Sequence, residues 1–375
     1  MKIAFVTNFY NHHQKPLADA MYSMLGDDYH FIETKPISEE RLNMGWGGDQ
    51  RPSYILQSYT DEASKNRCQD IIDNADVVIY GSAPHKMMEA RLKKGRLTFI
   101  YSERPYKEGI PYIKLPLHIY KASKKYRRYK NLYILCASAY TAADFAKMWA
   151  FIGKAYKWGY FPETKEYEDI DALIEAKVPN SIMWTARMID WKHPEKAIEV
   201  AKRLKADGYS FTLNMIGNGS LENEMRDKVI AEGLCDCVKL LGAMKPEEVR
   251  ENMEKSEIFL FTSDRNEGWG AVLNESMNSA CAVVASHAIG SVPFMIEDGE
   301  NGYIYKDSDI DDMYLKVKRL LDNGEERKRI SKNAYLTMIK EWNAQNAAER
   351  LISFAKGVLN GEKSEVLSGP CSRSK

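Results

Sequence analysis

The chain has 375 residues, of which 53 are basic and 53 are acidic. This length accommodates two domains with separate cores, and the balanced charge does not indicate a polyanionic partner for the chain as a whole. No apolar run reaches the roughly 20 residues needed to cross a bilayer, and the apolar start is too short for a signal peptide. The six cysteines lack the spacing of a zinc or redox pair. We therefore expect a cytoplasmic protein with reduced thiols.

Strand-like and helix-like segments alternate through the first 165 residues. Helices are predicted over residues 13–25, 61–74 and 87–94. Predicted apolar strands cover residues 2–7, 29–33, 75–81, 97–102 and 132–136. This alternation predicts a parallel sheet with helices on both faces. Because ligands bind such sheets at the carboxyl ends of the strands, the loops that follow the strands are the candidate sites.

Two of these loops carry polar side chains that could hold a substrate. His12 and His13 lie in the first loop, residues 8–14, and Glu103 and Arg104 follow the strand at residues 97–102. The histidine loop could equally be a polar turn that caps the next helix. Glu103 and Arg104 could read a ligand or form an ordinary salt bridge. We carry all four residues forward as candidates on the acceptor side.

Residues 91–131 concentrate positive charge in a chain that is neutral overall. The segment holds thirteen basic and two acidic residues, from Arg91 to Lys130, with six tyrosines among them. Basic residues near a bilayer are attracted to anionic lipid headgroups, by about 1 kcal/mol each. A solvated basic face is the alternative, and no nucleic-acid motif is present. The segment predicts a membrane-surface contact, with nucleic acid excluded as a partner.

The alternation of strands and helices resumes after an acidic linker, residues 166–180. Strands are predicted over residues 181–186, 211–216, 238–241, 257–262 and 282–285, in a second domain at residues 181–340. A last helix is predicted over residues 341–360. Residues 361–375 are rich in Ser, Gly, Pro and Lys, a composition that predicts a disordered tail.

The segment from residue 263 to residue 275 joins a buried strand to a helix through a glycine turn. Gly268 and Gly270 allow close approach to the backbone, and a helix start favours anions. Glu267 and Glu275 stand beside this position, where they would repel a phosphate. We therefore interpret the two carboxylates as hydrogen-bond acceptors for hydroxyl groups, as found on sugars.

Two cations follow the first strand of the second domain. Arg187 and Lys192 lie after residues 181–186, on the same edge of the predicted sheet as the Glu267 turn. Together with the amides of residues 270–272 they could neutralise a diphosphate; two solvated loop cations are the alternative. Asp307 and Asp309 have the spacing of a metal-binding pair, but a helix cap is the better interpretation.

Four segments in this order resemble the retaining glycosyltransferases of family 4. They are residues 186–192, 216–219, 267–275 and 298–302. The resemblance implies the GT-B fold, with two Rossmann-like doubly wound domains facing across a cleft and a last helix, residues 341–360, that returns to the N-terminal domain. The dense part covers residues 181–305. The first half matches only in its general rhythm, and it lacks the glycine pair that many members have in their first loop.

The resemblance also implies a role for each matching residue. Arg187 and Lys192 would hold the diphosphate, Glu267 would contact the transferred sugar, and Glu275 would accept hydrogen bonds from the ribose. Donor-binding backbone contacts are implied for Gly268, Gly270, Ala271, Val272, Gly217, Gly219 and, near the base, Gly242. The resemblance implies that Glu267 is a positioning residue and not a nucleophile, although retention often uses two close carboxylates.

The implied function is sugar transfer from a nucleotide diphosphate-sugar, with UDP the commonest donor nucleotide in the family. The acceptor would be a glycan or a lipid-linked intermediate of cell-surface polysaccharide or glycolipid synthesis. The protein would lie on the inner face of the plasma membrane, and neither a metal nor a cofactor is expected. The alternative is a non-catalytic sugar-nucleotide-binding or scaffold subunit with the same fold.

Overall fold

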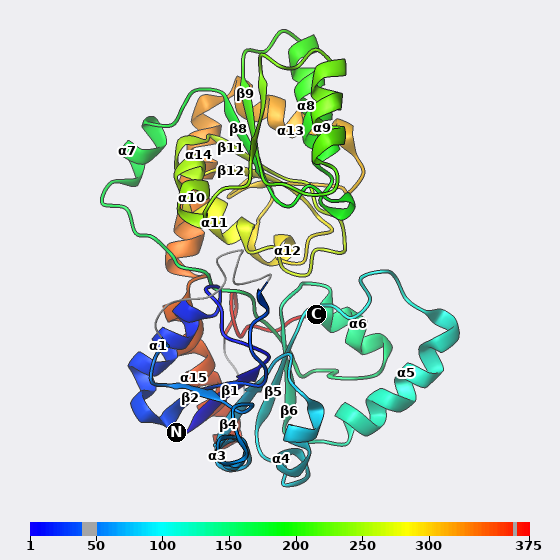
Figure 1. The fold of residues 1–375 in the computed structure, drawn as a ribbon, viewed down its shortest axis with the longest axis vertical. Helices are drawn as coiled ribbons and strands as arrows, with labels where there is room; N and C mark the ends of the chain where they lie inside the picture. The colour runs from blue at the N-terminus through cyan, green and yellow to red at the C-terminus, as the bar shows by residue number, and fades with distance from the viewer. Residues whose placement is uncertain (40–50, 363–365) are drawn as a thin grey trace. The chain divides into compact units, whose positions relative to one another are not determined.

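The computed structural model describes residues 1–39, 51–362 and 366–375, and they form two compact units. The first unit combines Met1–Glu163 with Asn343–Lys375, and the second is Thr164–Trp342. Each unit is a parallel β-sheet with helices packed on it (Figure 1). The predicted domain boundary at residue 165 lies two residues from the observed one.

The sheet of the first unit has seven parallel strands in the order β3-β2-β1-β4-β5-β6-β7. The chain moves outward from β1 to β3, then returns to the other side of β1 with β4. The strands are β1 (Ile3–Thr7), β2 (Tyr29–Glu33), β3 (Ile55–Gln57), β4 (Val77–Tyr80), β5 (Thr98–Ser102), β6 (Leu132–Cys136) and β7 (Ala155–Lys157). Each of β1 and β4 is buried along its whole length, as expected for central strands between helical layers.

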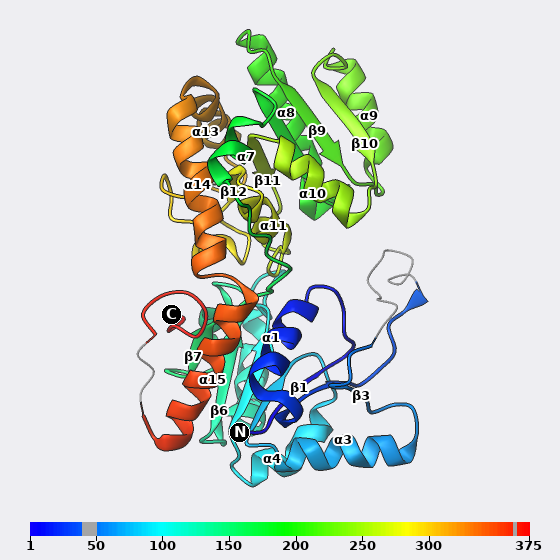
Figure 2. The same cartoon turned by 90° about the vertical axis from the view of Figure 1, so that its left-hand side faces the viewer.

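The first unit contains helices from the first 163 residues and also the last helix of the chain. α15 packs along α1, and its Phe354 ring lies against Tyr156 of β7 with ring centroids 4.3 Å apart (Figure 2). The helices are α1 (Lys15–Leu25), α3 (Glu62–Asn74), α4 (Glu89–Lys93), α5 (Leu115–Ala122), α6 (Thr141–Lys147) and α15 (Ala344–Asn360). The first unit is therefore completed by the last helix of the chain.

Several short elements of the first unit were not predicted from the sequence. β3 and β7 have three residues each, too few to show a periodic pattern. α5 lies in the stretch rich in basic residues and prolines, and α6 has only seven residues. A crossover between the parallel strands β5 and β6 requires a long connection, and α5 supplies part of it. The 3₁₀ turn Tyr112–Lys114 precedes α5, and a π-helical turn, Ser123–Arg127, continues it.

The predicted disordered tail is wrong for residues 366–375. Arg373 pairs with Tyr156 in an antiparallel bridge, the Lys157 amide donates to the Ser372 carbonyl at 2.7 Å, and Cys371 is fully buried. An edge strand has unpaired backbone groups, and here the chain end provides partners for those of β7. The composition of the segment gives no sign of this pairing, since the hydrogen bonds come from the backbone.

The sheet of the second unit has six parallel strands in the order β10-β9-β8-β11-β12-β13. The strands are β8 (Ser181–Thr185), β9 (Thr212–Ile216), β10 (Val238–Gly242), β11 (Ile258–Phe261), β12 (Ala282–Ser286) and β13 (Tyr303–Tyr305). The helices are α7 (Ile170–Glu175), α8 (Pro194–Ala206), α9 (Glu222–Ala231), α10 (Pro246–Lys255), α11 (Val272–Asn278), α12 (Val292–Met295), α13 (Ile310–Asp322) and α14 (Gly324–Lys340). The chain order reverses between β8 and β11, as it does between β1 and β4 in the first unit.

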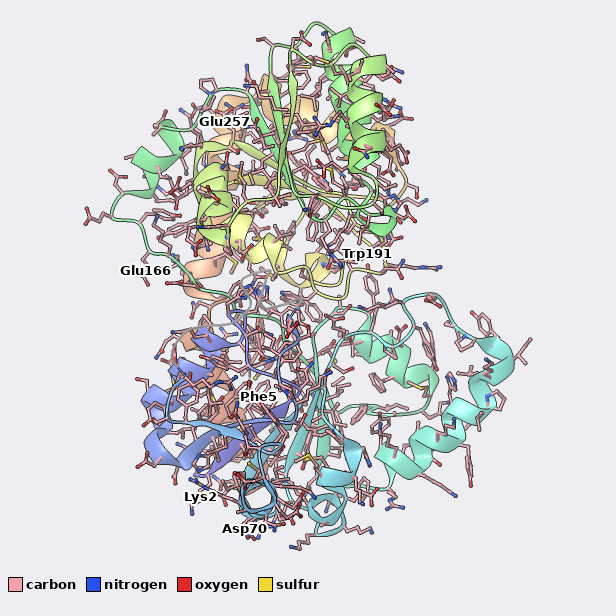
Figure 3. The ribbon with its side chains drawn as sticks, viewed as in Figure 1. Lys2, Phe5, Asp70, Glu166, Trp191 and Glu257 are labelled. Carbon is pink, nitrogen blue, oxygen red and sulfur yellow. The ribbon has the colours of Figure 1, made fainter. Side chains whose placement is uncertain are left out.

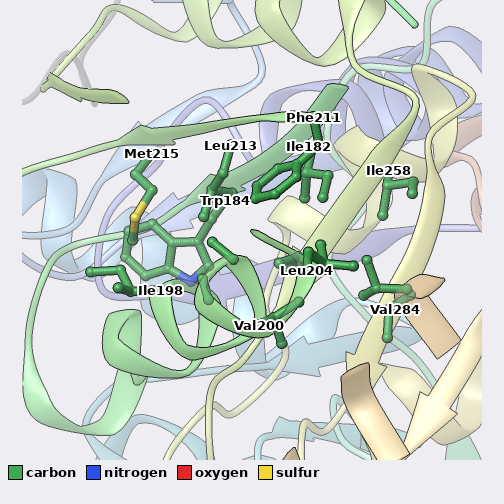
Figure 4. Packing of buried hydrophobic residues seen from close by; sticks show 14 of the residues in the cluster. Ile182, Trp184, Ile198, Val200, Leu204, Phe211, Leu213, Met215, Ile258 and Val284 are labelled. Atoms are coloured by element: carbon green, nitrogen blue, oxygen red, sulfur yellow. The ribbon is translucent and has the colours of Figure 1, made fainter. Parts of the chain in front are cut away.

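A continuous apolar core fills the space between the second sheet and helices α8, α9 and α13 (Figure 4). Trp184 of β8 is fully buried in it, between Ile198 of α8 and Met215 of β9. Helices α10, α11 and α14 lie on the other face of the sheet (Figure 1). The core holds β8 and β11 rigidly, so the loops at their carboxyl ends start from fixed positions.

The predicted linker is not free of the second unit. It contains α7, in which Ile174 is buried beside Tyr335 and Ala280. Asp171 forms an ion pair with Lys332 at 2.6 Å, and Glu175 pairs with Lys328 at the same distance. Acidic residues of the predicted linker therefore face basic residues of α14.

Candidate functional site

The candidate residues of the second unit gather where the strand order reverses. β8 and β11 are neighbours in the sheet, yet their outgoing loops lead to helices on opposite faces. Ligands of doubly wound sheets bind at such a reversal, outside the carboxyl ends of the strands. Arg187 and Lys192 follow β8, and Glu267 follows β11, so the topology brings all three to this position.

Lys192 and Glu267 form an ion pair across the two loops. The Lys192 ammonium donates to Glu267 Oε2, and both side chains are largely buried. The Ser263 hydroxyl donates to the same Oε2 at 3.0 Å. Sequence reasoning missed Ser263, although its position directly after the buried strand and four residues before Glu267 could have indicated it. The pair holds the carboxylate in one orientation with its charge balanced.

The two loops are also joined through their backbones. Thr262 Oγ1 accepts from the Trp184 indole at 2.8 Å and donates to the Lys192 carbonyl at 2.6 Å. The Asp264 amide donates to the Trp191 carbonyl at 3.0 Å. Lys192 Nζ lies 4.4 Å from the centroid of the Trp191 ring. Trp191 is labelled in Figure 3. These contacts fix the position of the ion pair before any ligand binds.

Arg187 presents a cation that has no acidic partner in the described part of the chain. Its side chain is exposed, and its guanidinium lies 5.9 Å from the centroid of the Trp191 ring. Lys192 is engaged by Glu267, whereas Arg187 forms no ion pair with any of the described residues. An incoming anion would therefore meet the Arg187 charge first. The Trp191 ring holds this charge near the site.

Glu275 lies in the first turn of α11. Burial raises the pKa of its carboxyl group, and the nearby Arg250 guanidinium opposes this shift. Within residues 1–39, 51–362 and 366–375, no group donates a hydrogen bond to the Glu275 carboxylate. The Arg250 guanidinium instead donates to the Glu275 carbonyl and to the Asn278 side chain. The carboxylate oxygens therefore remain available to accept hydrogen bonds from a ligand.

Gly217 and Gly219 have a structural role that the sequence did not indicate. Their φ angles are 133° and 157°, and a Cβ at Gly217 would lie 1.9 Å from the Ala186 carbonyl oxygen. At Gly219 it would lie 2.3 Å from the Met188 carbonyl oxygen. The Met188 amide donates to the Asn218 carbonyl at 2.7 Å. These glycines let two loops of the same unit pack backbone to backbone, and that packing positions Arg187.

The turn before α11 is built around Trp269 and Gly270. Trp269 is fully buried and donates its indole N–H to Asn274 Oδ1 at 2.9 Å. Gly270 has a φ of 84°, and a Cβ there would lie 2.4 Å from the Phe261 ring. Gly268 is buried, whereas Ala271 and Val272 are partly exposed at the start of a seven-residue helix.

Gly242 is at the end of β10, where its carbonyl accepts from the Gly217 amide at 2.7 Å.

A cavity of about 650 Å³ lies at the corresponding position of the first unit. Its lining includes residues at the carboxyl ends of β1, β4 and β5, together with the side chains of His13, Glu103 and Arg104. This is again the place where the strand order of a sheet reverses. Three of the four predicted acceptor-side residues thus share one cavity; His12 does not line it and instead packs on His13, with ring centroids 3.9 Å apart.

The contacts of Glu103 and Arg104 answer the question that the sequence left open. The Arg104 guanidinium pairs with the buried Asp144 carboxylate at 3.2 Å, so much of its charge is used within the fold. Glu103 accepts from Lys107 at 2.6 Å and from the Tyr160 hydroxyl at 2.8 Å. The two residues therefore do not pair with each other, and each is held rigidly at the cavity wall.

Burial lowers the pKa of His13 to about 3, with a further decrease from the neighbouring His12. The ring is therefore neutral at physiological pH. A neutral imidazole can donate one hydrogen bond and accept another, which suits contact with an uncharged hydroxyl group.

Arg91 is not part of a membrane surface, and its inclusion in that surface is wrong. It is fully buried, and it donates to the carbonyls of Ile72, Ala75, Asp76 and Leu97 and to the Thr98 hydroxyl. Arg91 thus satisfies backbone oxygens at the ends of α3 and β4, where a hydrophobic side chain could not. Other cations of the basic segment are exposed, among them Lys93, Lys94 and most of the lysines and arginines from Lys114 to Lys130.

Asp309 is a helix cap, which agrees with the interpretation made from the sequence. Its carboxylate accepts from the Asp312 amide at the start of α13, and Asp307 forms an ion pair with Lys196 at 2.9 Å. Both carboxylates are thus used within the fold of the second unit.

Comparison with known proteins supports one family for the second unit. A family model described as Glycosyl transferases group 1 matches residues 167–337. Residues 167–337 form a glycosyl transferases group 1 domain. This segment contains Arg187, Lys192, Glu267 and Glu275, so the four polar candidates of the second unit all lie within the matched region.

Two curated relatives match the chain over similar lengths. Amylovoran biosynthesis glycosyltransferase AmsK of Erwinia amylovora is 31% identical over 169 residues, which are 44% of this chain and 40% of that protein. Alpha-D-kanosaminyltransferase of Streptomyces kanamyceticus is 28% identical over 170 residues, 45% of this chain and 44% of that protein. The chain thus spans less than half the length of these curated relatives.

A solved structure matches both units. Anabaena Alr3699/HepE in complex with UDP aligns with a TM-score of 0.71 at 14% identity, over 95% of this chain and 100% of that one. The predicted GT-B fold class, with two Rossmann-like α/β domains, is confirmed by this match and by the two observed sheets. None of the helices in the described ranges is long and apolar enough to cross a bilayer.

Proposed function

We propose that this protein is a retaining glycosyltransferase that moves a sugar from a UDP-sugar to a glycan or lipid-linked acceptor. The Lys192–Glu267 ion pair carries the proposal, because it holds a cation and a carboxylate together where β8 and β11 end. The group 1 domain and the UDP bound to HepE support a nucleotide-sugar donor. The name of the relative AmsK supports a place in polysaccharide synthesis.

In the proposed donor site, Arg187 and Lys192 bind the diphosphate and stabilise the negative charge that develops on it as it leaves. Glu267 accepts hydrogen bonds from hydroxyls of the transferred sugar, in the orientation set by Lys192 and Ser263. Glu275, whose carboxylate is available, accepts from the ribose hydroxyls. The amides of residues 268–272 complete the contacts to the sugar and the phosphates.

The reaction we propose exchanges one bond at the anomeric carbon for another. The acceptor oxygen bonds to C1 while the bond from C1 to the diphosphate oxygen breaks, and the acceptor proton passes to the departing phosphate. Attack on the face from which the diphosphate leaves retains the configuration. The positive charge of Arg187 and Lys192 would make a metal ion unnecessary. The acceptor would occupy the cavity of the first unit that His13 and Glu103 line.

The test compares Glu267→Gln with Glu251→Gln, which removes an exposed carboxylate from α10. Turnover of UDP-sugars, by transfer or hydrolysis, should fall roughly 100- to 1,000-fold in Glu267→Gln and stay unchanged in the control. Lys192→Gln should behave like Glu267→Gln. Circular dichroism should show that the variants remain folded.

Full turnover in Glu267→Gln and Lys192→Gln would contradict the catalytic proposal. A wild-type protein that UDP-sugars stabilise against heat, without transfer or hydrolysis of any of them, would instead identify a non-catalytic nucleotide-sugar-binding subunit. The two outcomes are distinguished in one set of samples, since binding and turnover are measured separately.

A further inference from the structure

The segment around α5 carries exposed apolar and basic side chains together. Between Tyr112 and Lys130 there are seven basic residues and no acidic residue. Ile113 is 97% exposed and Tyr112 is 72% exposed, at the turn that begins α5. A partner that covers these isoleucine and tyrosine side chains would remove apolar surface from water, which lowers the free energy.

The inner face of α5 and its π-helical extension is anchored to the first unit. Tyr106 shares a hydrogen bond of 2.9 Å with His118 Nδ1, Ala122 is buried, and Tyr126 packs on Phe145 and Phe151. His118, Ala122 and Tyr126 follow one another at intervals of four residues, so they share one side of the helix. The opposite side, which carries Leu117, Tyr120, Lys121 and Lys124, faces away from that packing.

A second exposed element extends the same surface. Trp149 is 56% exposed and Ile152 is 70% exposed, in the turn after α6. The Arg127 guanidinium lies 5.8 Å from the centroid of the Trp149 ring, which brings this turn next to the extension of α5. α5 lies at the periphery of the first unit, with its side chains extending outward (Figure 3).

We propose that this surface, formed by residues 112–130 and the Trp149–Ile152 turn, docks on a bilayer that contains anionic lipids. Ile113, Leu117 and Ile152 would enter the acyl boundary, Tyr112, Tyr120 and Trp149 would lie at headgroup level, and the lysines and arginines would contact lipid phosphates. Apolar anchors, aromatic rings and cations on one surface match the three layers of a membrane interface.

The charge and the exposed apolar groups argue against other occupants. A second copy of the chain would bring two sets of seven cations together, which is unfavourable. A nucleic acid would use the cations but would not cover Ile113 or Ile152 with an apolar phase. An anionic bilayer satisfies both kinds of side chain.

The docking surface continues to the cavity of the first unit. Lys125 and Tyr126 belong to the extension of α5 and also line that cavity, together with His13 and Glu103. A lipid-linked acceptor held in the bilayer would therefore have its polar end next to the cavity. This role rests on the proposed function, whereas the docking itself rests on exposure and charge.

The experiment is sedimentation of the full chain with phosphatidylglycerol–phosphatidylcholine vesicles, compared with pure phosphatidylcholine vesicles. The wild type should bind the anionic vesicles and should bind less as salt rises. Lys121→Gln/Lys124→Gln should weaken binding roughly 25-fold, since each cation near the surface contributes about fivefold. The matched control is Lys93→Gln/Lys94→Gln, which removes two exposed lysines at the end of α4 and should have little effect.

The apolar contribution has its own pair of variants. Ile113→Ser should weaken vesicle binding roughly tenfold, and Ile230→Ser, at a position 61% exposed in the second unit, should not change it. UDP binding should be the same in all four variants, so a loss of docking is distinguished from a failure of the proposed function. Vesicle binding without sugar transfer would leave the docking surface intact and contradict the proposed function alone.

Three outcomes would overturn the proposal. The first is a wild type that does not sediment with the anionic vesicles, and the second is an equal loss of binding in the control variants. The third is concentration-dependent self-association without vesicles that Ile113→Ser abolishes, which would identify a second copy as the occupant.

Discussion

Gly217 is the residue at which backbone conformation and close packing coincide. Its φ of 133° is rarely adopted by other residues, and an added Cβ would overlap the Ala186 carbonyl oxygen at 1.9 Å. Gly217→Ala should therefore lower the free energy of unfolding by more than about 3 kcal/mol, since the 186–188 loop must move. Urea unfolding at pH 7.5 would measure this change.

Gly208→Ala is the matched control for this prediction. Gly208 has a φ of 82°, but nothing lies within 4 Å of its added Cβ. The substitution should cost about 1 kcal/mol, from backbone strain alone. Equal losses in the two variants would show that the contact between the two loops does not matter for stability.

His13 makes the first unit sensitive to acid. Its pKa is lowered to about 3 in the folded protein by burial and by His12, whereas an unfolded histidine titrates near 6.5. Below pH 6.5 the unfolded chain binds a proton that the folded chain does not, so stability falls as the pH falls. At pH 5 this effect should amount to about 2 kcal/mol.

The His13→Gln variant isolates this contribution. Urea unfolding at pH 7.5 and pH 5.0 should show a loss of stability in the wild type that is about 2 kcal/mol larger than in His13→Gln. Histidines remote from this loop titrate equally in both proteins and cancel from the comparison. The same pH dependence in both proteins would contradict the buried, neutral state of His13.

At the scale of elements, the C-terminal segment protects the edge of the first sheet. Deletion of residues 366–375 would remove the hydrogen-bond partners of β7, including the Cys371 amide and the Ser372 carbonyl that bond to the Lys157 backbone. We expect a lower thermal midpoint and a tendency to associate through the free edge. Differential scanning calorimetry and sedimentation velocity would measure the two effects.

Leu367→Ser serves as the control for the deletion, since Leu367 is 96% exposed within the same segment. It should leave both the thermal midpoint and the association state unchanged. If the deletion also leaves them unchanged, backbone pairing with β7 contributes little, and the edge is protected in another way.

At the scale of the whole molecule, the two units differ in how the chain builds them. The second unit is one continuous segment, Thr164–Trp342, whereas the first needs both ends of the chain. The fragment 164–342 should therefore fold by itself, unfold cooperatively and, under the proposed function, bind UDP. Circular dichroism and calorimetry of the purified fragment would measure these properties.

The fragment 1–163 should not fold cooperatively on its own, because it lacks α15. Without this helix, α1 would lose the helix it packs against, and the Phe99 and Tyr156 rings would lose the cover of Phe354. Residues 343–375, attached through a flexible Gly–Ser linker, should restore a cooperative transition. Cooperative unfolding of 1–163 alone would show that α15 is dispensable for the first unit.

The sequence by itself determined the fold class and the edges of the sheets on which the sites lie. Repeated strand–helix alternation requires parallel sheets, and parallel strands end on one edge, so Arg187, Lys192 and Glu267 could be assigned to that edge from their positions after strands. The long strands, such as β1 and β11, were apparent because a strand buried on both faces is a continuous apolar run.

Only the tertiary structure decided which side chains meet. Lys192 and Glu267 are 75 residues apart, and their contact depends on β8 lying beside β11, an order that local sequence does not encode. The burial of Arg91 and the pairing of residues 366–375 with β7 have the same cause. Charge and composition describe a residue's preference for water, whereas its partners depend on chain segments that only folding brings together.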